Sequence, residues 1–189
     1  MTISLNTLRF WISNERLMIK VTNEERSQKV FDALEAMDLK YEVFSHPPVA
    51  TVDEAKDHWG HIKGSKAKNL FVRDQKGKKH YLIVLEQDKP LNMKWFSEHF
   101  GLDKLSFASP ERMEKYLGLQ PGSVSPFGLI NDANKEVMVY IDEDVMKDGF
   151  VNFHPNINTM TLNMASEDFK KFLQATGNKV QFVSIHMSE

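Results

Sequence analysis

The chain has 189 residues, a formal net charge of −2 and no cysteine. This length fits one domain of ordinary size. The absence of cysteine excludes disulfides, thiolate metal sites and a cysteine nucleophile, and it suits a reducing, cytoplasmic setting. A slightly acidic chain also lacks the global basic excess of proteins that coat DNA or RNA, so any contact with RNA must be local.

Residues 1–20 are expected to form a poorly ordered N-terminal extension that precedes one domain over residues 21–189. Polar residues such as Asn6, Arg9 and Glu15 interrupt the apolar ones in this segment. This pattern argues against a signal peptide and against a membrane-spanning helix. Met18 stands just before the first predicted helix and is a candidate natural start.

Apolar residues at helical spacing, introduced by capping residues, predict the helices. Asn23 is a candidate cap for the first helix, Thr51 for the second and Ser166 for the last. Ser109 is followed by Pro110, which suits the first helical position. The predicted helices cover residues 23–37, 51–58, 92–100, 110–117 and 166–173.

The strands are predicted from alternating or β-branched segments. Lys68–Arg73 and His80–Glu86 are joined by a polar, glycine-containing loop, which is typical of a hairpin. Because several strands are linked in this way, the sequence favours a mixed α+β sheet over a purely parallel one. The other predicted strands cover residues 41–44, 128–131, 137–142, 156–164 and 179–185.

Three separated segments are unusually polar or irregular for their apolar surroundings: Lys68-Asn69 at the opening of a strand, the loop Gly122–Pro126, and Phe153-His154-Pro155. With these motifs the chain resembles the YbaK and prolyl-tRNA synthetase associated deacylase superfamily, most of all its PrdX, or alanyl-tRNA(Pro) deacylase, branch. The resemblance runs from Val21 to the C-terminus. It rests on HPPVAT at 46–51, KNLFVRD at 68–74, LSFAS at 105–109, GSVSPFGL at 122–129, and FHP at 153–155 followed by Asn158-Thr159.

The resemblance implies a mixed, largely antiparallel, barrel-like sheet flanked by helices, and a trans-editing hydrolase that deacylates mischarged tRNA, with alanyl-tRNA(Pro) as substrate. It implies catalytic roles for Lys68, Gly122 and His154. Lysine is a long point charge suited to phosphate, and glycine lets loop amides approach an ester and hold its oxyanion. Further implied substrate contacts are Val52, Ala55, Asn69, Ser123, Ser125, Pro126 and Asn158.

An aminoacyl ester is already activated, so positioning a water could suffice without a covalent intermediate. No metal or other cofactor is expected, because His58 and His61 have no suitably spaced carboxylate or thiol partner. Residues 56–80 contain eight Lys or Arg against two acids. This excess predicts a grip on the tRNA acceptor end through Lys63, Lys66 and Arg73, and prolyl-tRNA synthetase is a candidate protein partner.

Each feature also has an ordinary structural interpretation. Lys68 could protect an edge strand, His154 could be a hydrogen-bonded structural histidine, and the loop at 122–126 could be a simple turn. Three functional alternatives stay open: a deacylase for serine or cysteine, a non-catalytic tRNA-binding module associated with a synthetase, and a small-molecule hydrolase.

Overall fold

The computed structural model describes residues 21–47 and 62–185. The predicted N-terminal extension therefore lies outside the described residues. So does the predicted helix that begins at Thr51, with Val52 and Ala55 of the implied aminoacyl pocket and with His58 and His61.

Within the described residues, eight strands form one mixed sheet in the order β1-β7-β6-β2-β3-β5-β8, with β4 paired to β2. Four pairings are antiparallel (β1–β7, β2–β3, β2–β4, β6–β7) and three are parallel (β2–β6, β3–β5, β5–β8). This confirms the expected mixed, largely antiparallel sheet. The strands are β1 (Tyr41–Ser45), β2 (Ser65–Asp74), β3 (His80–Glu86), β4 (Leu105–Phe107), β5 (Val137–Asp142), β6 (Phe150–Phe153), β7 (Met160–Ala165) and β8 (Val180–Val183).

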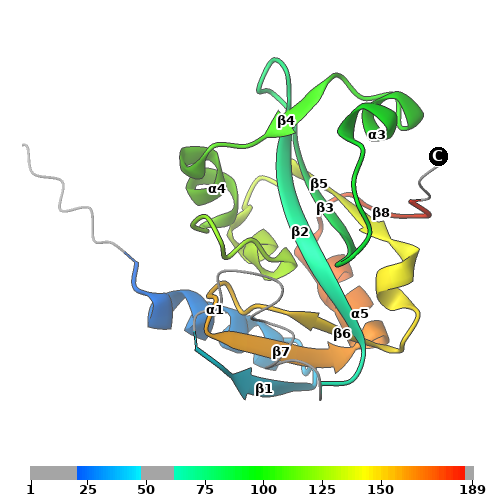
Figure 1. Ribbon diagram of the computed structural model, residues 1–189. Coiled ribbons are helices and arrows are strands. Elements are labelled where there is room, and N and C mark those ends of the chain that lie inside the picture. The colour runs from blue at the N-terminus through cyan, green and yellow to red at the C-terminus, as the bar shows by residue number, and fades with distance from the viewer. Residues whose placement is uncertain (1–20, 48–61, 186–189) are drawn as a thin grey trace, which may run out of the picture.

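The long strand β2 joins two groups of strands that run in different directions (Figure 1). β1, β7 and β6 lie at the lower end of β2 in this view, and β3, β5 and β8 lie alongside and behind it. The helices are α1 (Asn23–Ala36), α3 (Met93–His99), α4 (Pro110–Leu117) and α5 (Ser166–Thr176), with short 3-10 helices η1 (Pro126–Asn131) and η2 (Glu143–Met146).

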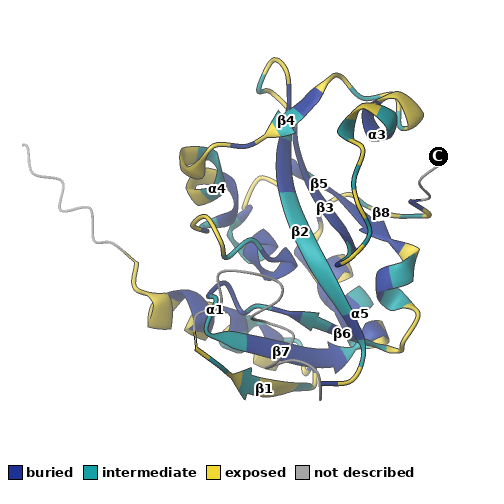
Figure 2. Cartoon of the chain, in the orientation of Figure 1, coloured by how far each residue is buried: buried dark blue, intermediate teal, exposed yellow. Residues whose placement is uncertain are grey.

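Both faces of the sheet are covered, because alternate side chains of β3 enter two different cores. Leu82 and Val84 pack in a first cluster with residues of α1, α4 and α5. Tyr81, Ile83 and Leu85 pack in a second cluster with Phe96 of α3. β3 is coloured as buried along nearly all of its length, which reflects this double cover (Figure 2).

The ends of the helices follow local chemistry. Thr22, rather than the predicted Asn23, caps α1, and it forms a capping box in which its Oγ1 accepts from the Glu25 amide at 3.2 Å. α4 spans the predicted residues and ends at Gly118, whose φ of 63° is the left-handed conformation that favours glycine. The predicted cap Ser166 is instead the first residue of α5.

The predicted strand at 128–131 is wrong, because this segment belongs to η1. Ser125 caps η1 through the Phe127 amide, and Pro126 starts it. A Cβ on Gly128 would lie 2.8 Å from Leu119 Cδ1, so this turn packs too closely on the core for a larger residue. The strand predicted from Asn156 begins only at Met160, while β4 and β6 are strands that the sequence pattern did not reveal.

Candidate active site

One edge of β2 is interrupted beside the loop at 122–126. β3 occupies the other edge along residues 67–73. The interrupted edge pairs with β6 at residues 65–66 and with β4 at residues 72–74. The stretch between them, from Ala67 to Leu70, has no strand partner on that edge within the described chain. Loops from distant parts of the sequence can therefore reach the middle of β2.

Two side-chain hydrogen bonds bring these loops together. Asn69 Nδ2 donates to the Val124 carbonyl at 3.0 Å. Ser125 Oγ donates to the His154 carbonyl at 2.6 Å and accepts from the Phe127 amide at 3.2 Å. Hydrogen bonds therefore connect β2, the 122–126 loop and the segment after β6.

A hollow lies where these segments meet. It has about 300 Å³ of space not filled by atoms, part of which is open to solvent. β2, β6 and β7 supply most of its walls, so main-chain pairing positions them. The described residues that line it are Lys66, Ala67, Asn69, Gln87, Asn152, Phe153, His154 and Thr161.

His154 is held as a neutral wall of this hollow. Its Nδ1 lies 3.0 Å from the Met160 carbonyl, which can only accept, so Nδ1 carries the proton. Burial lowers the pKa of His154 below its ordinary value of 6.5; the Met160 hydrogen bond opposes this shift and the nearby His46 adds to it. A neutral imidazole offers hydrogen bonding and shape rather than a fixed positive charge.

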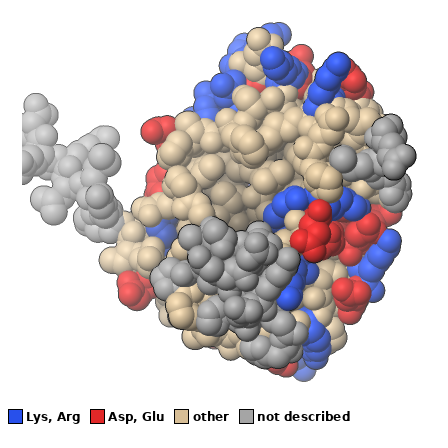
Figure 3. Space-filling view, in the orientation of Figure 1, with Lys and Arg blue, Asp and Glu red and all other residues tan. Residues whose placement is uncertain are grey.

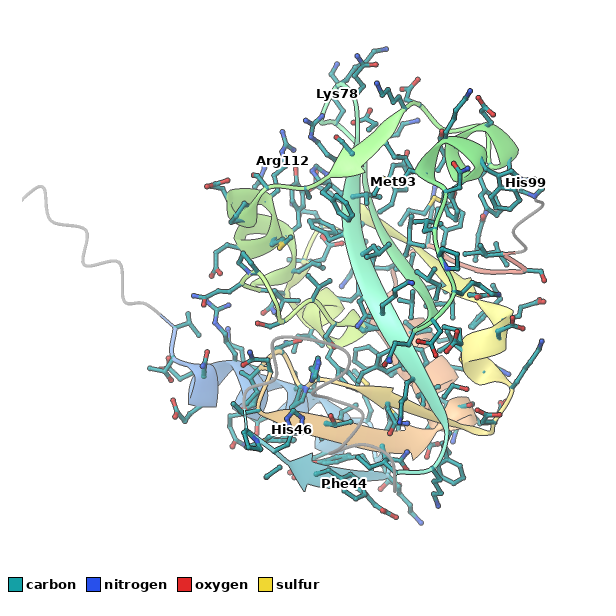
Figure 4. All side chains as sticks on the ribbon, in the orientation of Figure 1. Phe44, His46, Lys78, Met93, His99 and Arg112 are labelled. Atoms are coloured by element: carbon teal, nitrogen blue, oxygen red, sulfur yellow. The ribbon has the colours of Figure 1, made fainter. Side chains whose placement is uncertain are left out.

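His46 joins the same cluster from the end of β1. Its ring centroid lies 6.1 Å from that of His154, and its Nε2 lies 3.1 Å from Thr161 Oγ1. Figure 4 places His46 at the lower end of the molecule, far from Lys78 at the hairpin tip. Sequence reasoning quoted His46 only as part of a motif, and the structure puts it beside the hollow.

Lys68 reaches the rim of the hollow rather than its wall. Successive side chains of a strand point to opposite faces, so Lys68 and Asn69 diverge. Lys68 Nζ donates to the Gln87 carbonyl at 3.0 Å, and Gln87 is itself a lining residue. Asn69, which the sequence interpretation gave a secondary role, is the residue of this motif that lines the hollow.

Residues 122–126 and Asn158 are not among the described residues that line the hollow. Gly122 is exposed with φ of 84°, and a Cβ there would meet nothing within 4 Å, so backbone conformation is what requires glycine. Pro126 is buried as the start of η1, while Ser123 and Asn158 are half-buried. Ser125 has no exposed surface, and its hydroxyl clamps the loop to the segment that carries His154.

The three predicted tRNA-binding residues are split between the two ends of β2. Lys66 lines the hollow, and Lys63 is exposed nearby with its Nζ 3.8 Å from the Phe150 ring centroid. Arg73 lies toward the hairpin tip, where it donates to the carbonyls of Asp74 and Gln75. At about 3.3 Å per residue, Arg73 is roughly 23 Å along β2 from Lys66. In Figure 3 basic side chains lie at the top and again to the right and lower right of an uncharged central surface.

The aminoacyl-tRNA editing domain family matches residues 46–172, a range that contains the convergent segments of β2, the loop and His154. The chain belongs to this family. The editing domain is 37% identical over 161 residues to the prolyl-tRNA editing protein ProX of Acetoanaerobium sticklandii, covering 85% of this chain and 98% of that protein. It is 33% identical over 149 residues to prolyl-tRNA synthetase associated domain-containing protein 1 of Mus musculus, covering 77% of this chain and 88% of the relative.

A solved structure supports the fold. The crystal structure of a candidate trans-editing enzyme for prolyl tRNA synthetase superposes with a TM-score of 0.63 at 24% identity, covering 85% of this chain and 98% of the other. The resemblance derived from the motifs is thus confirmed. By family, the editing domain is an aminoacyl-tRNA deacylase, which hydrolyses the ester of a mischarged tRNA. No helix among its described residues is long and apolar enough to cross a bilayer.

Sequence reasoning missed Asn152, Thr161 and Gln87, which line the editing domain's hollow, and Asn163, which is hydrogen-bonded to Asn152. Asn152 and Asn163 face each other across β6 and β7, and Asn163 Nδ2 donates to Asn152 Oδ1 at 2.9 Å and to the Lys63 carbonyl at 2.8 Å. Asn152 lies among apolar residues of β6 and Asn163 is a buried polar residue of β7, and polar residues within largely apolar strands are the signal that could have found them.

Proposed function

We propose that this editing domain hydrolyses alanyl-tRNA(Pro) in trans, with Lys68 and the Gly122–Pro126 loop positioning the acceptor end and the attacking water. The observation that carries this proposal is the pair of hydrogen bonds, Asn69 to Val124 and Ser125 to His154, that connects the loop to two residues lining the hollow. Prolyl-tRNA synthetase is proposed as the partner that supplies the mischarged tRNA.

The loop offers hydrogen-bond donors suited to an oxyanion. The Ser123 amide donates to the Gln120 carbonyl at 3.1 Å. Within the described chain, the next two amides, of Val124 and Ser125, donate no hydrogen bond. Successive backbone amides form a concave binding site for negative charge, and such donors stabilise the oxyanion formed when water attacks an ester.

Lys68 supplies charge at the rim. Among the residues that the structure describes, its ammonium group donates to one acceptor, the Gln87 carbonyl, which a phosphate or ribose oxygen of the acceptor end could replace. His154, neutral and fixed by Met160, would bound the aminoacyl side chain. None of these groups needs to act as a nucleophile, because the aminoacyl ester is already activated and the neighbouring ribose hydroxyl can assist the water.

The preference for a small aminoacyl group rests on the resemblance to alanyl-tRNA(Pro) deacylases. The hollow has about 300 Å³ of space not filled by atoms, part of which is open to solvent. Serine and cysteine differ from alanine by one heavy atom, which a pocket distinguishes by only about 1–3 kcal/mol.

The test is release of labelled amino acid from tRNA(Pro) charged with alanine, serine or cysteine. Wild-type protein should release alanine fastest, Lys68→Ala should abolish turnover, and Lys40→Ala, which alters an exposed lysine after α1, should leave it unchanged. Unchanged turnover in Lys68→Ala would defeat the proposed role of this lysine. Binding without release would indicate a non-catalytic module, and ester cleavage insensitive to free tRNA would indicate a small-molecule hydrolase.

A further inference from the structure

A second hollow lies at the opposite end of β3, where three strands begin side by side. His80 of β3 pairs in register with Val137 of β5, and Val139 pairs with Val180 of β8. The residues just before these strands therefore lie close together at one end of the sheet. The hollow there has about 690 Å³ of space not filled by atoms, part of it open solvent, and its charged lining residues are Lys79, Lys135, Lys179 and Glu136.

Lys79, Lys135 and Lys179 reach this hollow from three turns that are far apart in the sequence. None of them forms an ion pair with another described residue, and one acid, Glu136, lines the hollow with them. Five other described lysines have acidic partners within 4.0 Å: Lys89, Lys94, Lys147, Lys170 and Lys171. Because unpaired lysines are common among the described residues, the feature of this hollow is that three of them lie around one depression. Three lysines against one lining acid give this depression a formal balance of 3 minus 1, or +2, in an otherwise slightly acidic protein, and this excess favours a local positive potential.

Buried aspartates fix the turns that carry these lysines. Asp132, 3% exposed, accepts from the amides of Glu136 and Val137 and from Asn178 Nδ2 at 2.7 Å. It thus connects the turn before β5 to the residue before Lys179. Asp74, 2% exposed, accepts from the Lys79 amide at 3.1 Å. The lysine backbones are therefore anchored, while their side chains stay extended into solvent.

We propose that Lys79, Lys135 and Lys179 form a second RNA-contact surface that binds the phosphodiester backbone of the tRNA. This inference rests on the proposed function for the identity of the RNA, but not for the existence of the surface. His80 borders this hollow and Gln87 borders the first one. Seven residues of extended chain place them roughly 23 Å apart, so the surface contacts RNA some distance from the aminoacyl end.

The sequence suggested only part of this surface. Lys79 belongs to the basic stretch at 56–80, but Lys135 and Lys179 lie more than 50 residues further along the chain. Lysine ammonium groups neutralise phosphates without reading bases, so the contact adds affinity and orientation rather than sequence selection. It would supplement Lys63 and Lys66 beside the first hollow.

The experiment compares a triple variant, Lys79→Gln, Lys135→Gln and Lys179→Gln, with a charge-matched control, Lys94→Gln, Lys170→Gln and Lys171→Gln. Direct binding of uncharged tRNA and hydrolysis of Ala-tRNA(Pro) are measured over a range of salt concentrations. The triple variant should weaken tRNA binding and raise KM roughly tenfold at unchanged kcat, and its slope of log affinity against log salt should fall by about 2–3. The control should resemble wild type.

Equal tRNA affinity in the triple variant and wild type would overturn the proposed RNA-contact surface. An equal loss of tRNA affinity in the control variant would overturn it as well. If inorganic phosphate bound the wild type through these lysines while the triple variant kept its tRNA affinity, the hollow would be a small-anion site and the RNA assignment would be wrong. If Ala-tRNA(Pro) were not hydrolysed at all, the proposed function would fail, but the tRNA-binding comparison would still decide this inference.

Discussion

The Ser125 hydroxyl donates to the main-chain carbonyl of His154 across 2.6 Å, although 29 residues separate them. Ser125 is fully buried, and the same oxygen accepts from the Phe127 amide at the start of η1. One hydroxyl therefore sets both the path of the 122–126 loop and the position of the segment that carries His154.

Ser125→Ala should lower the free energy of unfolding by about 2 kcal/mol, because it removes a helix cap and leaves the His154 carbonyl without its donor. Deacylation should also fall, since the loop and His154 are no longer held together. Chemical denaturation and labelled-alanine release measure the two effects. Ser123→Ala, in the same loop, should change stability by less than about 0.5 kcal/mol; equal losses in both variants would contradict the clamp.

Lys89→Met should lower the free energy of unfolding by about 3 kcal/mol, because it leaves a buried carboxylate uncompensated. Lys89 Nζ lies 2.6 Å from Asp142 Oδ2 and 2.6 Å from Asp144 Oδ2, and the Asp142 side chain is 0% exposed. Burial acts to lower the pKa of Lys89, but its hydrogen bonds to both aspartates outweigh burial and raise it.

The matched control is Lys94→Met, which breaks an exposed ion pair with Glu98 and should change stability by less than about 1 kcal/mol. Adding Asp142→Asn to Lys89→Met should recover part of the loss, since the buried charge is then absent. Denaturation of the four proteins measures these differences. A loss in Lys89→Met no larger than in Lys94→Met would show that the buried pair does not stabilise the fold.

Stability should decrease as pH falls below 6.5. Burial lowers the pKa of His154 and of His80 below the ordinary value of 6.5, so the unfolded chain binds protons in a range where the native protein does not. Each histidine then contributes at most about 1.4 kcal/mol per pH unit between its unfolded and folded pKa. Carboxylates such as Asp144, with a pKa of about 2, act only at lower pH.

Urea denaturation between pH 5 and 7.5 measures this dependence. His154→Gln should flatten the slope in the region just below pH 6.5, whatever its effect on absolute stability. A slope identical to that of wild type would mean that His154 takes up its proton equally in both states.

Asp132→Ala should lower the free energy of unfolding by about 3 kcal/mol. The change removes the acceptor for the amides of Glu136 and Val137 and for Asn178 Nδ2, and unpaired buried donors cost about 1–3 kcal/mol each. Asn134→Ala alters an exposed residue of the same turn and should be nearly neutral. Thermal or chemical unfolding compares the two, and similar stabilities would contradict the anchoring role of Asp132.

Local patterns were sufficient for elements that depend on neighbouring residues. The β2–β3 hairpin and α4 follow from turn glycines, capping positions and periodicity within about a dozen residues. Local patterns failed at η1, where an apolar segment resembled a strand, because a distant contact between Ser125 and His154 and close packing on Leu119 select a helical turn.

The sequence by itself determined the family, since the order of its motifs along the chain does not depend on how the chain is folded. It also located the segments that carry the candidate chemistry. Only the tertiary structure decided that Asn69 lines the hollow while Lys68 stands at its rim, and that Lys135 and Lys179 join Lys79. Strand pairing sets which side chains share a face of the sheet and which turns lie together at one end of it. The paired strands are too far apart in the chain for any local pattern to specify their pairing.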